Sequence, residues 1–289
     1  MTDRMQDARM AGSGTRASLG LILALGLLSA CGNTTNRLAP GELEEMSAVE
    51  IYQKGEGSLE GGQSEDAAFY FGEIERLYPY SEWAKRGLIM QAFAHHKDRA
   101  YDESRASAQR YLDFYPTSED AAYAQYLLAL SYYDQIDDIG RDQGLTFQAL
   151  QALRAVIEQY PDSSYAAEAK LKFDLAFDHL AAKEMEIGRY YLKRNHYAAA
   201  ARRFRVVVED FQTTTHTAEA LHRLVESYLS LGLLEEAQTA GAILGYNYRG
   251  TDWYRDSYAL LTGRGLRPEA AGDNWLAAIY RQLVRGEWI

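Results

Sequence analysis

Apolar residues recur at helical spacing along the chain. In one segment, five of them fall on a single helix face: Leu221, Leu224, Val225, Tyr228 and Leu231. No stretch of useful length alternates apolar and polar residues as a half-buried strand does. The pattern predicts an all-α protein.

One short motif interrupts the helical pattern repeatedly. It consists of an aromatic residue, then any two residues, then Ser or Thr. It begins at Tyr78, Tyr115, Tyr160, Phe211 and Tyr248. Proline stands second in the first three copies and cannot continue a helix, whereas Ser or Thr can cap the next helix by accepting from an exposed N–H. Each copy is therefore expected to end one helix and begin another.

A small residue stands twelve positions before the second residue of every motif, and a small residue lets two helices approach closely. These residues are Ala67, Ser104, Ala149, Ala200 and Ala237. The constant spacing predicts that the second helix of each pair has a fixed length, so that insertions fall in the first helix or in its turn.

The distance from the capping residue to the next small residue shows where the insertions lie. It is 23 for both Ser81–Ser104 and Thr214–Ala237, 31 for Ser118–Ala149 and 37 for Ser163–Ala200. The first excess contains two glycines within residues 136–144 and predicts a loop. The second excess is close to four turns at 3.6 residues each, so it predicts one long helix from Ser164 to about Lys193.

A helix pair that recurs at this interval is typical of tetratricopeptide repeats. We therefore expect a right-handed α-solenoid of about five tetratricopeptide-like helix pairs in residues 46–264. Residues 265–289 are expected to form a C-terminal helix and tail. There an apolar stripe could cap the array, and its members are Trp275, Leu276, Ile279, Tyr280 and Leu283.

The first 30 residues have the organisation of a lipoprotein signal peptide. Three arginines precede an apolar run from Leu19 to Leu28, about half of the ~20 residues that a membrane-spanning helix needs. The run ends in Leu28-Ser-Ala-Cys31, which resembles a lipobox, so Cys31 is the expected acylation site. Gly32 favours the outer membrane, and residues 31–45 would form an acylated flexible tether. A plain secretory signal with a coincidental cysteine is the alternative.

Charge and composition exclude several kinds of partner and site. The net charge is −11 and no stripe of Lys and Arg is present, so nucleic acid is not an expected partner. The single cysteine excludes an internal disulfide framework and a cysteine-rich metal site. None of the six histidines stands four residues from another, so no metal site is expected.

The sequence contains no nucleophile-elbow, P-loop or dinucleotide-binding motif. Asp174 and Asp178 share a helix face, but they stand among lysines and are read as solvated charges. We expect a protein that is not an enzyme and needs no cofactor.

Two groups of residues are candidates for interaction. Tyr123 and Tyr126 belong to a tyrosine stripe that either packs between helices or lines a concave surface for extended peptides. The segment 183–194, which includes Tyr190 and Tyr191, and the following Arg202, Arg203 and Arg205 form a basic patch. Arginine binds carboxylates bidentately, which suits a protein interface. The alternative is a charged outer face on a long helix.

Three segments together resemble the BamD/ComL family, and the likeness extends from Cys31 to about Leu261. They are Tyr78-Pro-Tyr-Ser-Glu-Trp83, Ser131-Tyr-Tyr-Asp-Gln-Ile136 with the loop after it, and Lys183-Glu-Met-Glu-Ile-Gly-Arg-Tyr-Tyr191. The resemblance implies a non-enzymatic lipoprotein of the outer-membrane β-barrel assembly machinery, anchored through acyl chains and facing the periplasm. Its implied partners are the POTRA domains of the barrel subunit, other assembly lipoproteins and unfolded outer-membrane protein segments.

The resemblance also implies where those partners bind. Repeats 1 and 2 would form the substrate groove, with Tyr70, Phe71 and Trp83 near it, and repeats 4 and 5 would dock the barrel subunit, with Arg203 and its neighbours at that face. Gln212 and Arg249 replace the proline of the motif in the last two repeats, and the tail from Gly265 departs from the family pattern.

Two other functions are open at this point. A periplasmic tetratricopeptide adaptor lipoprotein could serve secretin assembly or coordinate cell-wall synthesis with division. An enzyme of envelope metabolism would need an acid, base or metal constellation that the sequence does not offer.

The signal-peptide interpretation yields a first prediction. Cys31→Ser should leave an unacylated protein that is soluble or mislocalised, because the thiol is the atom that carries the lipid. Membrane fractionation together with metabolic labelling by a fatty acid measures this. If the variant is still acylated and found in the outer membrane, Cys31 is not the lipid anchor.

Overall fold

The computed structural model describes residues 37–270 and 275–279. The predicted signal peptide, Cys31 and two members of the predicted C-terminal stripe, Tyr280 and Leu283, lie outside these residues. Within them no strand occurs. The helices are α1 (Pro40–Glu44), α2 (Ala48–Glu60), α3 (Ser64–Leu77), α4 (Glu82–Lys97), α5 (Tyr101–Phe114), α6 (Ala121–Tyr133), α7 (Gly144–Gln159), α8 (Ser164–Leu192), α9 (Tyr197–Asp210), α10 (Thr217–Leu231), α11 (Leu234–Asn247) and α12 (Asp252–Thr262).

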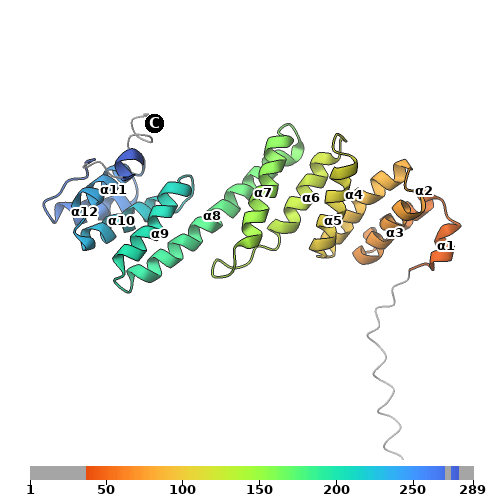
Figure 1. Cartoon of the computed structure of the whole chain (residues 1–289), viewed down its shortest axis with the longest axis horizontal. Coiled ribbons are helices and arrows are strands. Elements are labelled where there is room, and N and C mark those ends of the chain that lie inside the picture. The colour runs from red at the N-terminus through yellow and green to blue at the C-terminus, as the bar shows by residue number, and fades with distance from the viewer. Residues whose placement is uncertain (1–36, 271–274, 280–289) are drawn as a thin grey trace, which may run out of the picture. The chain divides into compact units, whose positions relative to one another are not determined.

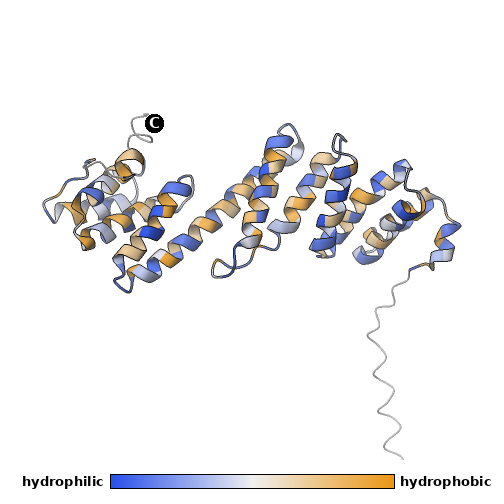
Figure 2. Ribbon diagram, viewed as in Figure 1, coloured by the Kyte–Doolittle hydropathy of each residue, from blue (hydrophilic) through white to orange (hydrophobic). Residues whose placement is uncertain are grey.

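The helices form five hairpins, α2/α3, α4/α5, α6/α7, α8/α9 and α10/α11, and each packs on the hairpin next to it in sequence (Figure 1). Helix α12 packs on α10 and α11. Most of these helices carry both apolar and polar residues, as a helix needs when it is covered on one side only (Figure 2). The predicted α-solenoid of tetratricopeptide-like helix pairs is confirmed.

The five aromatic motifs form the junctions between hairpins, as predicted. At each one the aromatic residue donates its backbone N–H to the carbonyl four residues back and so closes the last helical turn. The Ser or Thr backbone N–H then donates to the carbonyl of that aromatic residue at 3.0–3.2 Å. This second bond turns the chain out of the first helix, in repeats with proline and without it.

The expected role of the motif hydroxyls is only partly right. Ser81 and Thr251 accept from a backbone N–H of the following helix, as predicted, at 3.1 and 3.3 Å. Ser118 and Thr214 precede their helices by three residues, so they are not N-cap residues, and Ser163 makes no capping bond. Four of the five hydroxyls instead donate to the backbone carbonyl of the motif's aromatic residue, at 2.7–2.8 Å. They belong to Ser81, Ser163, Thr214 and Thr251.

The small residues lie where helices meet, as predicted. Ala67, Ser104, Ala149, Ala200 and Ala237 are all fully buried. The one polar member, Ser104, donates to the carbonyl of Ala92 at 2.9 Å and accepts from Ser131 at the same distance. A hydroxyl is therefore tolerated at this contact because both of its hydrogen-bonding roles are filled.

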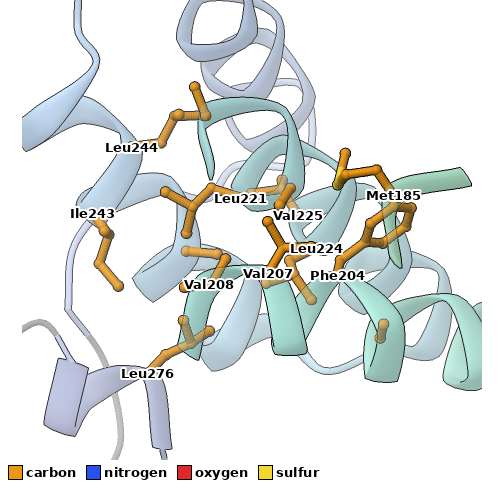
Figure 3. Close-up of a cluster of buried hydrophobic side chains, with 14 of the residues drawn as sticks. Met185, Phe204, Val207, Val208, Leu221, Leu224, Val225, Ile243, Leu244 and Leu276 are labelled. Carbon is orange, nitrogen blue, oxygen red and sulfur yellow. The ribbon is translucent and has the colours of Figure 1, made fainter. Parts of the chain in front are cut away.

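Helix α8 runs unbroken from Ser164 to Leu192, as the fourteen-residue insertion predicted, and the eight-residue insertion is a loop that ends where α7 begins at Gly144. The N-terminal half of α8 contributes Ala169 to a core with α6 and α7. The C-terminal half contributes Met185 to a larger core, where it lies beside Phe204 (Figure 3). A single helix thus belongs to two cores.

The largest core continues through the last hairpins. Leu221, Leu224 and Ile243 are among its fully buried side chains (Figure 3). The helical residues 275–279 bury Leu276 and Ile279 against it, and the indole N–H of Trp275 donates to the hydroxyl of Tyr228 at 3.2 Å. This part of the C-terminal stripe covers the end of the core, as a capping helix should.

Gly188 provides a test of the close approach between α8 and α9. A Cβ atom there would overlap the ring of Phe204, which is fully buried and has little room to move. Gly188→Ala should therefore lower the free energy of unfolding by about 1–3 kcal/mol, measured by urea denaturation.

Gly57 in α2 is the matched control, because a Cβ there meets nothing within 4 Å. Gly57→Ala should stabilise the protein by about 0.5–1 kcal/mol. Equal effects of the two substitutions would show that α8 and α9 do not approach as closely as described.

Candidate functional site

Three of the five residues predicted for the substrate groove belong to the core instead. Tyr70 and Tyr126 are each 4% exposed and Phe71 is fully buried. The ring of Phe71 occupies the space over Gly55, where a Cβ atom would lie 2.6 Å from it. These aromatic residues fill the space between helices in this structure, and their contact with a bound peptide stays a prediction.

Trp83 and Tyr123 are half-buried and keep part of their surface accessible. Trp83 packs on Tyr52 with ring centroids 5.0 Å apart, and the guanidinium of Arg86 lies 5.0 Å from its ring. Tyr123 lies 5.2 Å from the ring of Tyr165, and burial raises the pKa of Tyr123 to about 12. Trp83 lies on α4 and Tyr123 on α6, and each contacts a different aromatic partner.

The residues of the predicted partner-binding patch on α9 point in two directions. Arg203 forms an ion pair with Glu184 of α8, 3.0 Å between Nη1 and Oε2. Arg205 forms an ion pair with Glu209 at 2.8 Å, and its guanidinium lies over the ring of Trp275. Arg202 is exposed and forms no ion pair within the described residues.

Tyr190 and Tyr191 lie near the C-terminal end of α8. Their rings meet edge to face at 5.6 Å, and the guanidinium of Arg194 covers Tyr190 at 3.7 Å. Tyr190 is 52% exposed, whereas Tyr191 packs partly against the largest core. Of this pair, Tyr190 is the residue with surface to offer a partner.

Two residues of α8, Arg189 and Asp178, make polar contacts with the beginning of α10 and the residues just before it, His216 among them. Arg189 donates two hydrogen bonds to Glu219 at 2.9 and 2.7 Å. Asp178 accepts from the backbone N–H and the hydroxyl of Thr215 at 3.0 and 2.8 Å. The sequence had indicated that Asp178 is one of a pair of solvated charges. In the structure it is instead a contact between α8 and the residues before α10.

The carboxyl of Glu219 is charged at neutral pH despite its partial burial. Burial alone would raise its pKa, but the hydrogen bond from Arg189 and the charges of Arg189 and Arg223 hold the pKa below its ordinary value of 4.5. A depressed pKa means that this interaction stabilises the fold above the unfolded-state pKa and is lost as the pH falls through the folded-state value.

Two open cavities flank α9, and neither was predicted from the sequence. One, of about 740 Å³, lies between α7 and α9 with α8 beneath it. The other, of about 450 Å³, is lined by Arg202 and Arg205 of α9 and by Tyr228, Leu231 and Leu233. Val206 lines both, so α9 exposes surface on two sides.

Within the described residues, no group of three or more His, Cys, Asp or Glu side chains is arranged to hold a metal ion. No helix in that part of the chain is long and apolar enough to cross a bilayer.

Comparison with known proteins relates this chain to one family. The family described as "YfiO: Outer membrane lipoprotein" matches residues 44–243. The outer membrane protein assembly factor BamD of Caulobacter vibrioides is 49% identical over 225 residues, 78% of this chain and 74% of that protein. The protein of the same name in Rickettsia prowazekii is 41% identical over 211 residues, 73% of this chain and 84% of that protein.

A solved structure of a thermophilic tetratricopeptide protein of Thermus thermophilus is a looser match. It superposes with a TM-score of 0.35 at 20% identity, over 74% of this chain and 98% of that one.

The pair between Arg189 and Glu219 yields a pH-dependent prediction. Arg189→Met should lower the free energy of unfolding by about 1–2 kcal/mol at neutral pH, since a half-buried carboxylate loses a two-bond partner. The difference from the parent should shrink as the pH falls from 4.5 through the depressed folded-state pKa of Glu219, because protonation removes the charge that Arg189 stabilises. Urea denaturation at about pH 7 and about pH 3 measures it.

Arg255→Met is the control, because Arg255 pairs with Asp252 on an exposed surface. It should cost less than about 1 kcal/mol. A deficit in Arg189→Met that does not change with pH would contradict the assigned role of the Glu219 charge.

Proposed function

The chain belongs to the YfiO family of outer membrane lipoproteins, and on that premise we propose that it is a non-enzymatic scaffold of the machinery that assembles outer-membrane β-barrels. The resemblance to the BamD/ComL family is confirmed, since both relatives at more than 40% identity carry the name BamD and span most of the chain. No feature of the described residues specifically favours an adaptor for secretin assembly or cell division.

The proposed location is the periplasmic face of the outer membrane. The family description, an outer membrane lipoprotein, supports an anchor there, and Cys31 is the residue in the chain that can carry it. Buried acyl chains contribute about 0.8 kcal/mol per CH₂, so two or three chains together form a stable anchor. Residues 31–45 would separate this anchor from the helical repeats.

The proposed docking site for the POTRA domains of the barrel subunit is the exposed side of α9. The observation that carries this proposal is Arg202, an exposed arginine with no ion pair among the described residues in a protein of net charge −11. Arg205 lines the same cavity and Tyr190 is half-exposed at the end of α8. Arg203 contributes less directly, because its charge already meets Glu184.

The proposed receiving surface for nascent outer-membrane proteins lies in the first repeats. Since Tyr70 and Phe71 are buried, the aromatic surface available there includes Trp83, Phe114 and Tyr80, which is fully exposed at the junction before α4. Tyr123 lies in the neighbouring third hairpin, on α6. Exposed aromatic side chains offer large contact areas at low entropic cost, which suits unfolded segments.

Charge reversal at Arg202 tests the docking site. Arg202→Glu should reduce co-purification with the POTRA-containing barrel subunit after mild detergent extraction by about tenfold or more, because a cation at the interface becomes an anion. The melting temperature should not change, since the side chain forms no internal ion pair.

Lys54→Glu is the matched control, because Lys54 is an exposed cation on α2, in the first repeat. It should leave co-purification intact. Undiminished recovery of the complex with Arg202→Glu would remove this side of α9 from the docking site.

A further inference from the structure

The larger cavity is a groove that runs along the middle of α8. Its floor is formed by α8, one wall by α7 and the preceding loop, and the other wall by α9. Because α8 is longer than the other helices, α7 packs on its N-terminal half and α9 on its C-terminal half, which leaves the middle of α8 only partly covered. We name this the aromatic groove.

Aromatic side chains form much of its floor. Phe173 and Phe177 of α8 stack with ring centroids 5.8 Å apart, and Phe177 meets Phe211 at 4.8 Å. Phe147 stands at the α7 wall and is 55% exposed. A soluble protein seldom leaves several large aromatic residues accessible in one hollow unless something binds there.

The charged residues divide between the two walls. Arg141, Arg154 and Lys183 lie toward α7 and its loop, and Lys183 reaches the carbonyl of Arg141 at 3.4 Å. Glu184 and Asp210 lie toward α9, where Glu184 is already neutralised by Arg203. The loop also contributes Asp142, which accepts from the backbone N–H of Gly144.

Two of the three cations form no ion pair with a carboxylate in the described part of the chain. Arg141 pairs with Asp137 at 3.1 Å, but Arg154 and Lys183 form no such ion pair. The guanidinium of Arg154 instead lies 5.4 Å from the ring of Phe173, directly beside the aromatic floor. An anionic group placed over this floor would therefore meet two cations on one side.

We propose that the aromatic groove binds an extended segment of a partner protein in which Asp or Glu side chains alternate with aromatic or aliphatic ones. Alternate side chains of an extended peptide point to opposite sides. The apolar side chains would enter the floor formed by Phe173 and Phe177, and the carboxylates would pair with Arg154 and Lys183. A volume of about 740 Å³ accommodates a few such side chains.

The aromatic groove would be a second peptide-binding surface of the proposed scaffold, in the third and fourth repeats and not in the first two. Binding in the groove is tested with the purified chain alone. If the groove does not bind peptide, the proposed docking of the barrel subunit on α9 is unaffected, because Arg202→Glu tests it separately.

The experiment measures binding of a synthetic probe to the full chain by fluorescence anisotropy. The probe is a fluorescein-labelled hexapeptide of alternating phenylalanine and glutamate, blocked at its C-terminus as the amide. Two comparison probes replace glutamate by glutamine, or leave the C-terminal carboxylate free. The glutamate probe should bind with a measurable Kd, and the glutamine probe about tenfold or more weakly.

Substitutions in the groove should weaken binding of the glutamate probe. Lys183→Gln and Arg154→Gln should each raise its Kd about tenfold, since each removes one charge-assisted contact. Lys170→Gln is the control, because Lys170 is an exposed lysine of α8 that pairs with Asp174, and it should bind like the parent. Phe147→Ser should also weaken binding, whereas Phe114→Ser, at a phenylalanine that is 60% exposed, should not.

Several results would overturn the proposal. They are no binding of the glutamate probe, equal binding of the glutamine probe, and unchanged affinity in both Arg154→Gln and Lys183→Gln. Binding of the free-acid probe alone would show that the groove recognises a chain terminus, which contradicts the assignment to Asp and Glu side chains.

Discussion

The continuity of α8 is the constraint on which the rest of the structure depends. A helical hairpin cannot bury its apolar face alone, so each one needs the next along the chain. At the fourth hairpin this need is met by one helix of 29 residues that enters two cores. Its fourteen extra residues nearly complete four turns, so the apolar face of its second half stays in phase with the first. An insertion far from a whole number of turns would turn Met185 and Gly188 away from α9.

The same constraint produces the surfaces that are available for binding. Where α8 is longer than its neighbours, its middle is covered incompletely, and the aromatic groove follows. Polar contacts then position the next hairpin, since Arg189 and Asp178 bind residues at the beginning of α10. Helix α9 is thereby held with one side toward the groove and the other toward the cavity lined by Arg202. The fold and the two cavities beside α9 thus share one origin.

The sequence predicted the repeat architecture well because its signals are local. Proline, serine and a small residue at fixed spacing specify turns and close contacts, and the length of the insertion specifies α8. The residues proposed for binding were harder to predict, because aromatic side chains suit a core and a groove equally. Phe71 is a core residue since Gly55, in a different helix, leaves room for its ring. The aromatic groove was missed because Phe147 and Val206, on its opposite walls, lie far apart in the sequence.

The most direct test of this account is the distance across α8. Spin labels at Leu171→Cys and Tyr190→Cys, two exposed positions, would be placed in a chain whose own cysteine is changed to serine. Nineteen residues of continuous helix span about 28 Å at 1.5 Å per residue. Pulsed electron paramagnetic resonance should therefore give one narrow distribution near that separation, broadened only by the label arms. A markedly shorter or a bimodal distribution would mean that α8 is broken in its middle, and would contradict the account.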